Sequence, residues 1–402
     1  MRRNMTVREV LNQKYWIARP LPIIQTEEET VRLNIVTDDI EKKSLLGGVA
    51  TSLILATQLC LENDWSLRII TRYTPCNLDD YYHFLKVQNL KKPKFVEGFS
   101  DERRDNNAIN YKMPVGKNDI FMATSWWSAK SILDLKIRNR ILYIIQEEET
   151  FFYPYGDERY WCEYILRDKR IDFIVNSKLL MDYFCNHGYQ TLCDNALYFE
   201  PAFPEHIYFA DTKTFQPKID EKRRIFFYGR PNNPRNLYYL GLECIDEAIE
   251  RGILDTDLWD IYMAGSNDIK TLAFTNGYVP KLNGQMSWED YAAFCRTIDL
   301  AISLMYTPHP SYPPFDMCCS GAVVLTNEFA NKKALSYSDN MLLVPLEKEA
   351  IISGIKIGMD LAVNLKSRQR NYENMKICRD WNKSLHSVVQ IISERARRKE
   401  YV

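Results

Sequence analysis

Short apolar runs alternate with amphipathic helical patterns along most of this sequence. Runs such as RLNIVT, LRIIT and ILYII have the length of a buried strand, and the segments between them carry apolar residues at helical spacing. This alternation is typical of βα units and a parallel sheet. It predicts a first set of strands at Arg32–Thr37, Leu67–Thr71, Ile120–Ala123, Ile141–Gln146, Phe173–Asn176 and Leu197–Glu200, and a second set at Arg224–Tyr228, Asp260–Ala264, Leu300–Met305, Ala322–Thr326 and Leu342–Val344.

The helical segments are predicted from the same periodicity. We expect helices at Val49–Leu61 and Leu237–Glu250, and another that begins at Ser287 as N-cap. Past Ser353 the pattern is helical to the end, with an apolar stripe made of Ile377, Trp381, Leu385, Val388, Val389 and Ile392. A long terminal helix has to bury that stripe, and crossing back onto the first domain is one way to do so.

Two sets of strands predict two domains. The chain has 402 residues, whereas a single core stops growing near roughly 250–300 residues. A proline-containing and charged segment, Pro201–Arg223, separates the sets and is the expected linker. The prediction is therefore an α/β protein with a Rossmann-like first domain and an N-terminal extension (1–204), a Rossmann-like second domain (222–370) and a C-terminal helix (371–402). In two doubly wound domains in tandem, the carboxyl ends of both sheets face a shared cleft.

Charge and cysteine content exclude several classes of protein. The net charge is -1, so no overall field attracts nucleic acid. The basic segment Arg395–Lys399 is interpreted as a solvated helix end, with peripheral contact at a membrane surface as the alternative. The ten cysteines are scattered, so neither a disulfide framework nor a metal site is expected. No apolar run approaches the ~18 residues of a membrane span, and the cytoplasm is the expected compartment.

A pair of glycines follows the first predicted strand. Gly47 and Gly48 precede the helix that begins near Val49, and paired glycines at a helix N-terminus let the backbone approach an anion. The alternative is a loop that simply needs a positive φ. Because the segment is not GxGxxG, a nicotinamide-binding site is disfavoured.

Two further loops of the first domain suit a carbohydrate. Trp126 and Trp127 follow one strand, and Glu147, Glu148 and Glu149 follow the next. An aromatic face stacks on the C–H face of a sugar while carboxylates bind its hydroxyls. A packed tryptophan and a solvated acidic run are the alternative.

The second domain begins with a loop suited to a diphosphate. The strand ends at Tyr228 and Gly229, and Arg230 and Arg235 follow before a helix. Two arginines at one strand end can bind a diphosphate by charge-assisted, bidentate contacts, and the alternative is two exposed loop arginines. Gly265, after the next strand, is small enough for a planar base to lie against the backbone.

The stretch TPHPSYPPFDM at residues 307–317 joins two predicted strands. Its prolines fix φ and stiffen the loop, so that polar side chains arrive at a ligand already ordered. Those side chains are His309, Ser311, Tyr312 and Asp316.

Three strings carry a family resemblance: IIQEEETFFYPYG, FFYGRPNNPRNL and YTPHPSYPPFDM. Together, between about Leu33 and Thr326, they resemble the WsaF-like rhamnosyltransferases of bacterial rhamnan synthesis, which are retaining GT-B glycosyltransferases. The resemblance implies a dTDP-L-rhamnose donor held mainly by the second domain and a glycan or lipid-linked glycan acceptor held by the first. It implies cell-surface glycan assembly at the cytoplasmic side of the membrane, without a metal or other cofactor.

Individual roles also follow from the resemblance. Arg230 resembles the family's arginine at the donor phosphates and is the expected catalytic group, with Arg235 beside it. Gly47 and Gly48 resemble the family's glycine loop near the same phosphates.

Three positions depart from the pattern of the family or its superfamily, and one of them is Pro308, which stands where the superfamily has the first of two glutamates. Asp316 stands where the family has a glutamate that holds the donor's ribose, and Gln285 stands where relatives carry a basic residue. Glu148 and Glu149 are the expected catalytic carboxylates at the acceptor. The sequence does not decide which of Glu147, Glu148 and Glu149 binds the acceptor or acts as a base.

Other functions remain open at this point. A nucleotide-sugar epimerase or hydrolase of similar build needs no acceptor, and a non-catalytic glycan-binding or nucleotide-sugar-binding protein needs no arginine at the phosphates. The sequence gives no oligomeric state.

Overall fold

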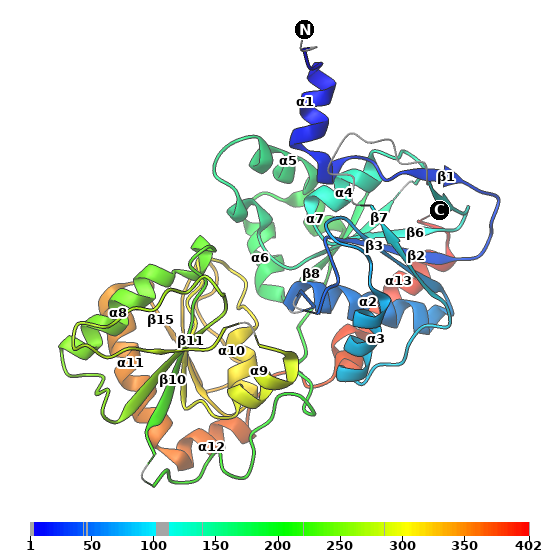
Figure 1. Ribbon diagram of the computed structural model, residues 1–402. Helices are drawn as coiled ribbons and strands as arrows, with labels where there is room; N and C mark the ends of the chain where they lie inside the picture. Colours follow the sequence, from blue (N-terminus) through cyan, green and yellow to red (C-terminus); the bar gives the residue numbers. More distant parts are fainter. Residues whose placement is uncertain are drawn as a thin grey trace. The chain divides into compact units, whose positions relative to one another are not determined.

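The computed structural model describes residues 4–401 apart from 43, 46, 102–111, 139, 220 and 285. The chain forms two compact units, each with its own sheet flanked by helices (Figure 1). Unit 1 comprises Met1–Pro201 and Asn382–Val402, and unit 2 comprises Ala202–Trp381.

The described part of unit 1 contains a parallel sheet with strand order β4-β3-β2-β6-β7-β8-β9. Its strands are β2 (Arg32–Thr37), β3 (Ser66–Thr71), β4 (Val96–Ser100), β6 (Ile120–Ala123), β7 (Ile141–Ile145), β8 (Ile171–Asn176) and β9 (Leu197–Phe199). A small parallel pair, β1 (Ile23–Gln25) and β5 (Met113–Val115), lies apart from it. Every residue of β6, β7 and β8 is buried, as expected for parallel strands covered on both faces.

The helices of unit 1 connect these strands. They are α1 (Val7–Lys14), α2 (Gly47–Asn63), α3 (Leu78–Val87), α4 (Trp126–Leu133), α5 (Asp157–Ile165), α6 (Lys178–Asn186), α7 (Gln190–Asn195) and α13 (Trp381–Arg397), with short 3-10 turns η1 (Trp16–Ala18) and η2 (Glu149–Phe152). Ser125 N-caps α4 by accepting from the Ser128 N–H, which fixes the start of the helix that carries Trp126 and Trp127.

Unit 2 is built on a second parallel sheet with order β12-β11-β10-β13-β14-β15. Its strands are β10 (Arg223–Tyr228), β11 (Trp259–Ala264), β12 (Lys281–Leu282), β13 (Leu300–Ile302), β14 (Val323–Asn327) and β15 (Met341–Val344). Its helical segments are η3 (Pro234–Asn236), α8 (Tyr238–Glu250), α9 (Trp288–Cys295), α10 (Pro313–Cys319), α11 (Lys348–Val363) and α12 (Leu365–Glu373). Ser287 N-caps α9 as predicted, with its side chain accepting from the Asp290 N–H.

The predicted strands are present in both sheets, with one clear shortening. The run Leu300–Met305 was expected as one strand, but β13 ends at Ile302. Beyond it the Met305 N–H donates to Asn327 Oδ1 at 2.8 Å. A side-chain oxygen thus accepts from this N–H in place of a backbone carbonyl of the neighbouring strand. The strands β1, β4, β5 and β12 were not predicted.

The segment expected as a linker packs within unit 2. The Phe203 ring stacks on Phe315 with centroids 4.9 Å apart, and the Ala210 N–H donates to the Tyr372 hydroxyl at 3.1 Å. Residue 202 begins unit 2 in this structure, because this proline-containing segment carries buried aromatic residues as well as charge.

The helical C-terminal region consists of α11, α12 and α13, and α13 belongs to unit 1. Its residues Leu385, Val388 and Ile392 are buried. The helix also bonds to α2, since Asn63 Nδ2 donates to Ser393 Oγ at 2.7 Å.

Near the end of the chain, Arg395 Nη1 donates to the buried Asp172 at 2.9 Å, and the Tyr401 hydroxyl donates to the same carboxylate at 3.1 Å. The segment that starts at Arg395 is therefore not uniformly solvated. None of the described helices is long and apolar enough to cross a membrane.

The structure contains a disulfide that the sequence analysis did not predict. Cys185 and Cys193 are joined, with their Cα atoms 5.6 Å apart. They lie on α6 and α7, whose packing brings them within bonding distance. That proximity is tertiary, and scattered cysteines do not reveal it.

Candidate functional site

The carboxyl ends of β2 and β7 in unit 1 gather acidic side chains. Glu149 is 5% exposed, and its Oε1 accepts from the Tyr143 hydroxyl at 2.6 Å. Its Oε2 accepts from the Trp126 N–H at 3.0 Å. Burial raises the pKa of Glu149 to about 8, so this carboxyl is largely protonated near neutral pH.

Glu148 is buried as well. Its Oε1 accepts from the N–H of Thr150 at 3.1 Å and from the hydroxyl of Thr150 at 2.5 Å, so it caps η2. Burial raises the pKa of Glu148 to about 7. Glu147 is half-buried, and its Oε1 accepts from the Glu148 N–H at 3.0 Å. Bonds from the protein itself thus hold the carboxyls expected to act in catalysis, and their catalytic role stays a prediction.

Asp38, which was not predicted as a site residue, joins this group. Its Oδ1 accepts from Trp127 Nε1 at 2.7 Å, and burial raises the pKa of Asp38 to about 6. Trp126 is buried and donates from Nε1 to the Tyr153 hydroxyl at 2.9 Å, whereas Trp127 is half-buried. We call Asp38, Glu148 and Glu149 the acidic edge of unit 1. The sequence feature that could have identified Asp38 is its position directly after the strand that ends at Thr37.

The glycine pair begins α2 in the same unit. Gly47 has φ 49°, in the left-handed region that favours glycine. A Cβ on Gly48 would lie 3.4 Å from Gln146 Nε2, and that nitrogen donates to the Gly48 carbonyl at 2.6 Å. The positive φ accounts for the glycine at position 47, a Cβ at position 48 would make only an ordinary contact, and the contact of this pair with donor phosphates stays a prediction.

In unit 2, Tyr228, Gly229 and Arg230 follow one another at the carboxyl end of β10. Arg230 is exposed, whereas Tyr228 is half-buried. Burial raises the pKa of Tyr228, and the Arg230 guanidinium beside its hydroxyl opposes that rise. Gly265, at φ 123°, lies against this strand end, because a Cβ there would come within 2.9 Å of both the Gly229 carbonyl and the Tyr228 ring. The space expected for a planar base is thus bordered by the Tyr228 ring.

Three loops are joined at this edge of the sheet of unit 2. The Tyr306 N–H, after β13, donates to the Arg235 carbonyl at 2.7 Å. Asn327, at the end of β14, donates from Nδ2 to the Met305 carbonyl at 3.0 Å. The Phe329 ring contacts Tyr306 with centroids 4.6 Å apart. The loops after β10, β13 and β14 are therefore held side by side.

Lys332 comes from the turn after β14 and is fully buried. We call Arg230, Arg235 and Lys332 the basic edge of unit 2. The sequence did not predict the burial of Lys332, because nothing in it separates Lys332 from the neighbouring Lys333.

The proline-containing stretch orders its polar residues, as the sequence suggested. His309 Nδ1 accepts from the Ser311 N–H at 3.0 Å, and Ser311 has φ 68°. Tyr312 contacts His309 edge-on, with centroids 6.0 Å apart. Pro313 and Pro314 occupy the first turn of α10, where a missing N–H costs nothing.

Asp316 is buried among tyrosines. The Tyr291 hydroxyl donates to its Oδ2 at 3.4 Å, and the Tyr208 hydroxyl also interacts with the carboxyl. Burial raises the pKa of Asp316 to about 8. Its expected role at the donor's ribose stays a prediction.

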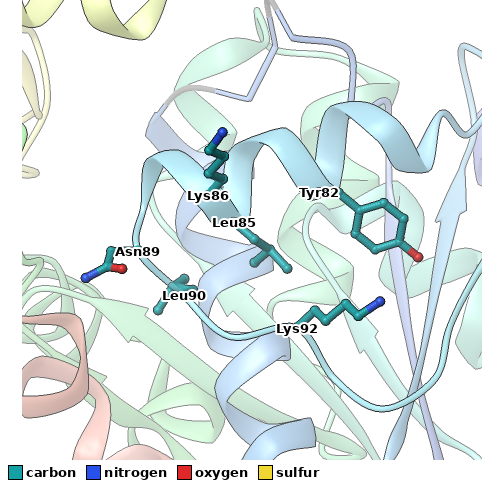
Figure 2. A pocket seen from close by; sticks show the side chains of 6 residues that line it. All are labelled: Tyr82, Leu85, Lys86, Asn89, Leu90 and Lys92. Carbon is teal, nitrogen blue, oxygen red and sulfur yellow. The ribbon is translucent and has the colours of Figure 1, made fainter.

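Gln285 lies outside the described residues. Across the part of the chain that the structure describes, no three His, Cys, Asp or Glu side chains gather in a way that suits a metal ion. A surface pocket of about 480 Å³ lies on α3 and the turn that follows it (Figure 2). It is lined by Tyr82, Leu85, Lys86, Asn89, Leu90 and Lys92, none of which was predicted as a site residue.

Figure 2 shows the Lys92 side chain extending toward Tyr82, in line with an ammonium 5.6 Å from the ring centroid. The Lys92 ammonium thus has an interaction partner within unit 1, the Tyr82 ring.

Comparison with known proteins gives matches in both units. The N-terminal domain of the WsaF family matches residues 32–178, and the C-terminal domain of the same family matches residues 223–356. The O-antigen biosynthesis protein RfbC of Myxococcus xanthus is 27% identical over 245 residues, which are 59% of this chain. The aligned region makes up about 18% of that protein's length.

Solved structures share the fold. HepE of Anabaena, solved with UDP-glucose, is 12% identical with a TM-score of 0.58, covering 92% of this chain and 98% of that one. TarM of S. aureus is 10% identical with a TM-score of 0.61, covering 90% and 99%. WaaG, a glycosyltransferase of lipopolysaccharide biosynthesis, is 9% identical with a TM-score of 0.56, covering 90% and 99%.

These neighbours are GT-B glycosyltransferases, and two parallel-sheet units are the architecture of that fold. This chain contains both domains of the WsaF family, the N-terminal one first and the C-terminal one after it. The chain therefore belongs to the WsaF family and has the GT-B fold.

Proposed function

We propose that this protein is a glycosyltransferase that moves L-rhamnose from dTDP-L-rhamnose to a glycan or lipid-linked glycan acceptor in the assembly of a bacterial cell-surface polysaccharide. The similarity to RfbC, an O-antigen biosynthesis protein, supports the cell-surface glycan. Rhamnose and the dTDP carrier rest on the resemblance of the three strings to rhamnosyltransferases.

The observation that carries the proposal is the basic edge at the end of β10. Arg230 is exposed directly after a buried strand, and Arg235 is held five residues on by the bond from Tyr306 to its carbonyl. Guanidinium groups at a strand end suit the diphosphate of a nucleotide-sugar. HepE was solved with UDP-glucose, and the same class of donor fits this edge.

In the proposed reaction, the bond between the sugar's anomeric carbon and the diphosphate breaks while a bond to an acceptor hydroxyl oxygen forms. Arg230 and Arg235 stabilise the negative charge that develops on the leaving diphosphate. For transfer with retention, departure and attack occur on the same face of the sugar. A donor phosphate oxygen then takes the proton of the acceptor hydroxyl, so that no protein nucleophile is needed.

The acidic edge is the proposed acceptor-binding part of unit 1. Burial raises the pKa values of its carboxyls, and carboxyl groups can form hydrogen bonds with the hydroxyls of a polyol. Trp127, half-buried beside Asp38, offers an aromatic face to the C–H side of a sugar ring.

The test is calorimetric titration of the whole chain with dTDP-L-rhamnose, dTDP, UDP-glucose and GDP-mannose, with EDTA and with added Mg²⁺. We expect binding of the dTDP compounds alone, at equal affinity under both conditions. Preference for another nucleotide would discard rhamnose, and a requirement for Mg²⁺ would overturn the expectation that no metal is needed.

A companion assay supplies donor without acceptor. Release or isomerisation of the sugar at a rate matching transfer would favour a hydrolase or epimerase. Absence of nucleotide binding would favour a non-catalytic glycan-binding protein.

A further inference from the structure

The segment that joins α3 to β4 in unit 1 carries several lysines and no acidic residue. Residues 81–96 read YYHFLKVQNLKKPKFV, and their charged side chains at neutral pH are those of Lys86, Lys91, Lys92 and Lys94. All four lysines are exposed. The segment is therefore locally positive on a chain whose net charge is -1.

The contacts of these lysines preserve that charge. Within the described residues, none of the four pairs with a carboxylate. The Lys92 ammonium lies 5.6 Å from the centroid of the Tyr82 ring, and the Lys94 ammonium lies 5.6 Å from that of the Phe95 ring. A cation–π contact attracts an ammonium without neutralising it, so the segment can still attract an anionic partner.

The backbone of the segment is ordered by its own contacts. The Leu90 N–H donates to the Leu85 carbonyl at 2.8 Å, which turns the chain directly after α3. Pro93 is buried, and its ring fixes φ in the middle of the loop. The Phe95 carbonyl accepts from the Leu67 N–H of β3 at 3.0 Å. The loop therefore presents its side chains from a fixed backbone.

Phe95 adds a large apolar group to this positive segment. Its side chain is 63% exposed, and it lies directly before β4, an edge strand of the sheet. A single exposed ring is common on protein surfaces, but this one follows three lysines within four residues. We call the four lysines, Tyr82 and Phe95 the lysine–aromatic surface of unit 1.

The pocket of about 480 Å³ is part of the lysine–aromatic surface. Lys86 reaches it from α3 and Lys92 from the loop that follows (Figure 2). Both ammonium groups donate hydrogen bonds, whereas Leu85 and Leu90 add apolar lining. Such a lining suits a molecule that is anionic in one part and apolar in another.

A bilayer with anionic lipids fits this surface better than a nucleic acid does. All four cations are lysines, whereas recognition of nucleic-acid phosphates and base edges relies strongly on the planar guanidinium of arginine. A membrane offers spread negative charge to lysines and an apolar layer to an aromatic ring at its interface.

We propose that the lysine–aromatic surface binds unit 1 to a membrane that contains anionic lipids, with the lysines at lipid phosphates and the Phe95 ring in the interface. This inference goes beyond the proposed transfer reaction and depends on neither its sugar nor its nucleotide. It also places the membrane contact away from the segment Arg395–Lys399. Phe95 lies at the amino end of β4, whereas the acidic edge lies at the carboxyl ends of β2 and β7, so that edge stays uncovered.

The test is sedimentation of the whole chain with vesicles of phosphatidylcholine, alone or mixed with phosphatidylglycerol. We expect binding to the mixed vesicles only. Lys92→Glu removes one positive charge and adds a negative one, so it should weaken binding roughly twentyfold to thirtyfold, at about fivefold per charge. Phe95→Ala should weaken it roughly fivefold to tenfold.

Matched controls lie next to each other on α11 in unit 2. Lys356 is exposed, and Ile357 is 55% exposed. Lys356→Glu and Ile357→Ala make the same kinds of change outside the lysine–aromatic surface, and both should bind mixed vesicles like the wild type. Losses equal to those of Lys92→Glu and Phe95→Ala would overturn the inference.

Entry of the ring into the interface has its own readout. Phe95→Trp adds an indole whose emission, taken as the difference from the wild type, should shift to shorter wavelength with mixed vesicles. Ile357→Trp should show no such shift. An unmoved signal from Phe95→Trp would overturn the inference.

Two rival results are separated in the same assay. Loss of vesicle binding in Arg397→Glu with Arg398→Glu, but not in Lys92→Glu, would overturn the inference in favour of the end of the chain. Lys92-dependent binding of soluble polyphosphate without binding of mixed vesicles would overturn it in favour of a soluble anion. Vesicle binding without any transfer activity would support the inference and count against the proposed function alone.

Discussion

The two sheets carry opposite chemistry at their carboxyl ends. The acidic edge of unit 1 gathers Asp38, Glu148 and Glu149, whose pKa values are all raised by burial. The basic edge of unit 2 consists of Arg230, Arg235 and Lys332. One type of parallel sheet thus presents two kinds of side chain at its carboxyl end.

The comparison shows that burial affects the ionisation of acidic and basic side chains differently. Burial favours the protonated form of a carboxyl, whereas an arginine stays charged. The acidic edge therefore offers groups that accept hydrogen bonds and, where protonated, also donate them, whereas the charged groups of the basic edge only donate. This division underlies the proposed placement of acceptor and donor.

The largest expected effect is at the basic edge. Arg230→Ala should lower kcat/KM roughly a hundredfold to a thousandfold, as for loss of one donor to developing negative charge. Arg251→Ala, which removes an exposed arginine paired with Glu247 and Glu349, is the matched control. Steady-state kinetics with dTDP-L-rhamnose measure both, and unchanged turnover in Arg230→Ala would remove Arg230 from the mechanism.

The acidic edge should make stability depend on pH. The pKa of Glu149 is raised to about 8 from 4.5, so the folded state holds a proton that the unfolded state releases. Its contribution is fully present below pH 4.5 and is lost as pH rises through 8, with a slope of at most about 1.4 kcal/mol per pH unit.

Denaturant unfolding between pH 5 and 9 measures this slope for the wild type and Glu149→Gln. The substitution should flatten the slope, whereas Glu163→Gln, at an exposed pair with Arg159, should not. Parallel curves for the wild type and Glu149→Gln would show that Glu149 is ionised in the folded protein.

A smaller effect is expected at the aromatic face. Trp127→Phe keeps a ring but removes the N–H that donates to Asp38. One hydrogen bond is worth about 1 kcal/mol, so the KM for acceptor should rise roughly fivefold while the affinity for donor stays the same. An equal loss for both substrates would indicate a general structural defect.

The smallest effect is the response to salt. Raising the ionic strength from 0.05 M to 0.3 M should weaken donor binding by roughly two- to threefold, because charges at the basic edge are screened. Acceptor KM, measured at saturating donor in the same buffers, should change less. A larger change for the acceptor would reverse the assignment of the two edges.

Much of the fold could be predicted because the strands are buried on both faces. Continuous apolar runs such as Ile141–Ile145 leave little choice of structure. The pair β1 and β5 was missed because each strand is three residues long and β5 contains Pro114. Such strands are set by their partners rather than by their own sequence.

The site was harder to predict because the direction of a side chain depends on its neighbours. Nothing in the run Glu147–Glu149 indicates that Glu149 turns toward Tyr143 and the Trp126 N–H. In the same way, Lys332 and Lys333 are alike in sequence and differ only through the turn at Ala330. Asp38, Lys332 and the Cys185–Cys193 disulfide all require tertiary proximity.

The assignment of α13 to unit 1 has a consequence for how the protein is made. Unit 2 is one continuous segment, Ala202–Trp381, whereas unit 1 also needs the residues from Asn382 onward. On the ribosome, unit 2 is therefore complete while α2 still lacks its partner on α13, including the bond from Asn63 to Ser393. Most of unit 1 is therefore synthesised before unit 2, but its core is completed after that of unit 2. A nascent chain stopped at Trp381 would expose the surface of α2 that α13 covers to chaperones.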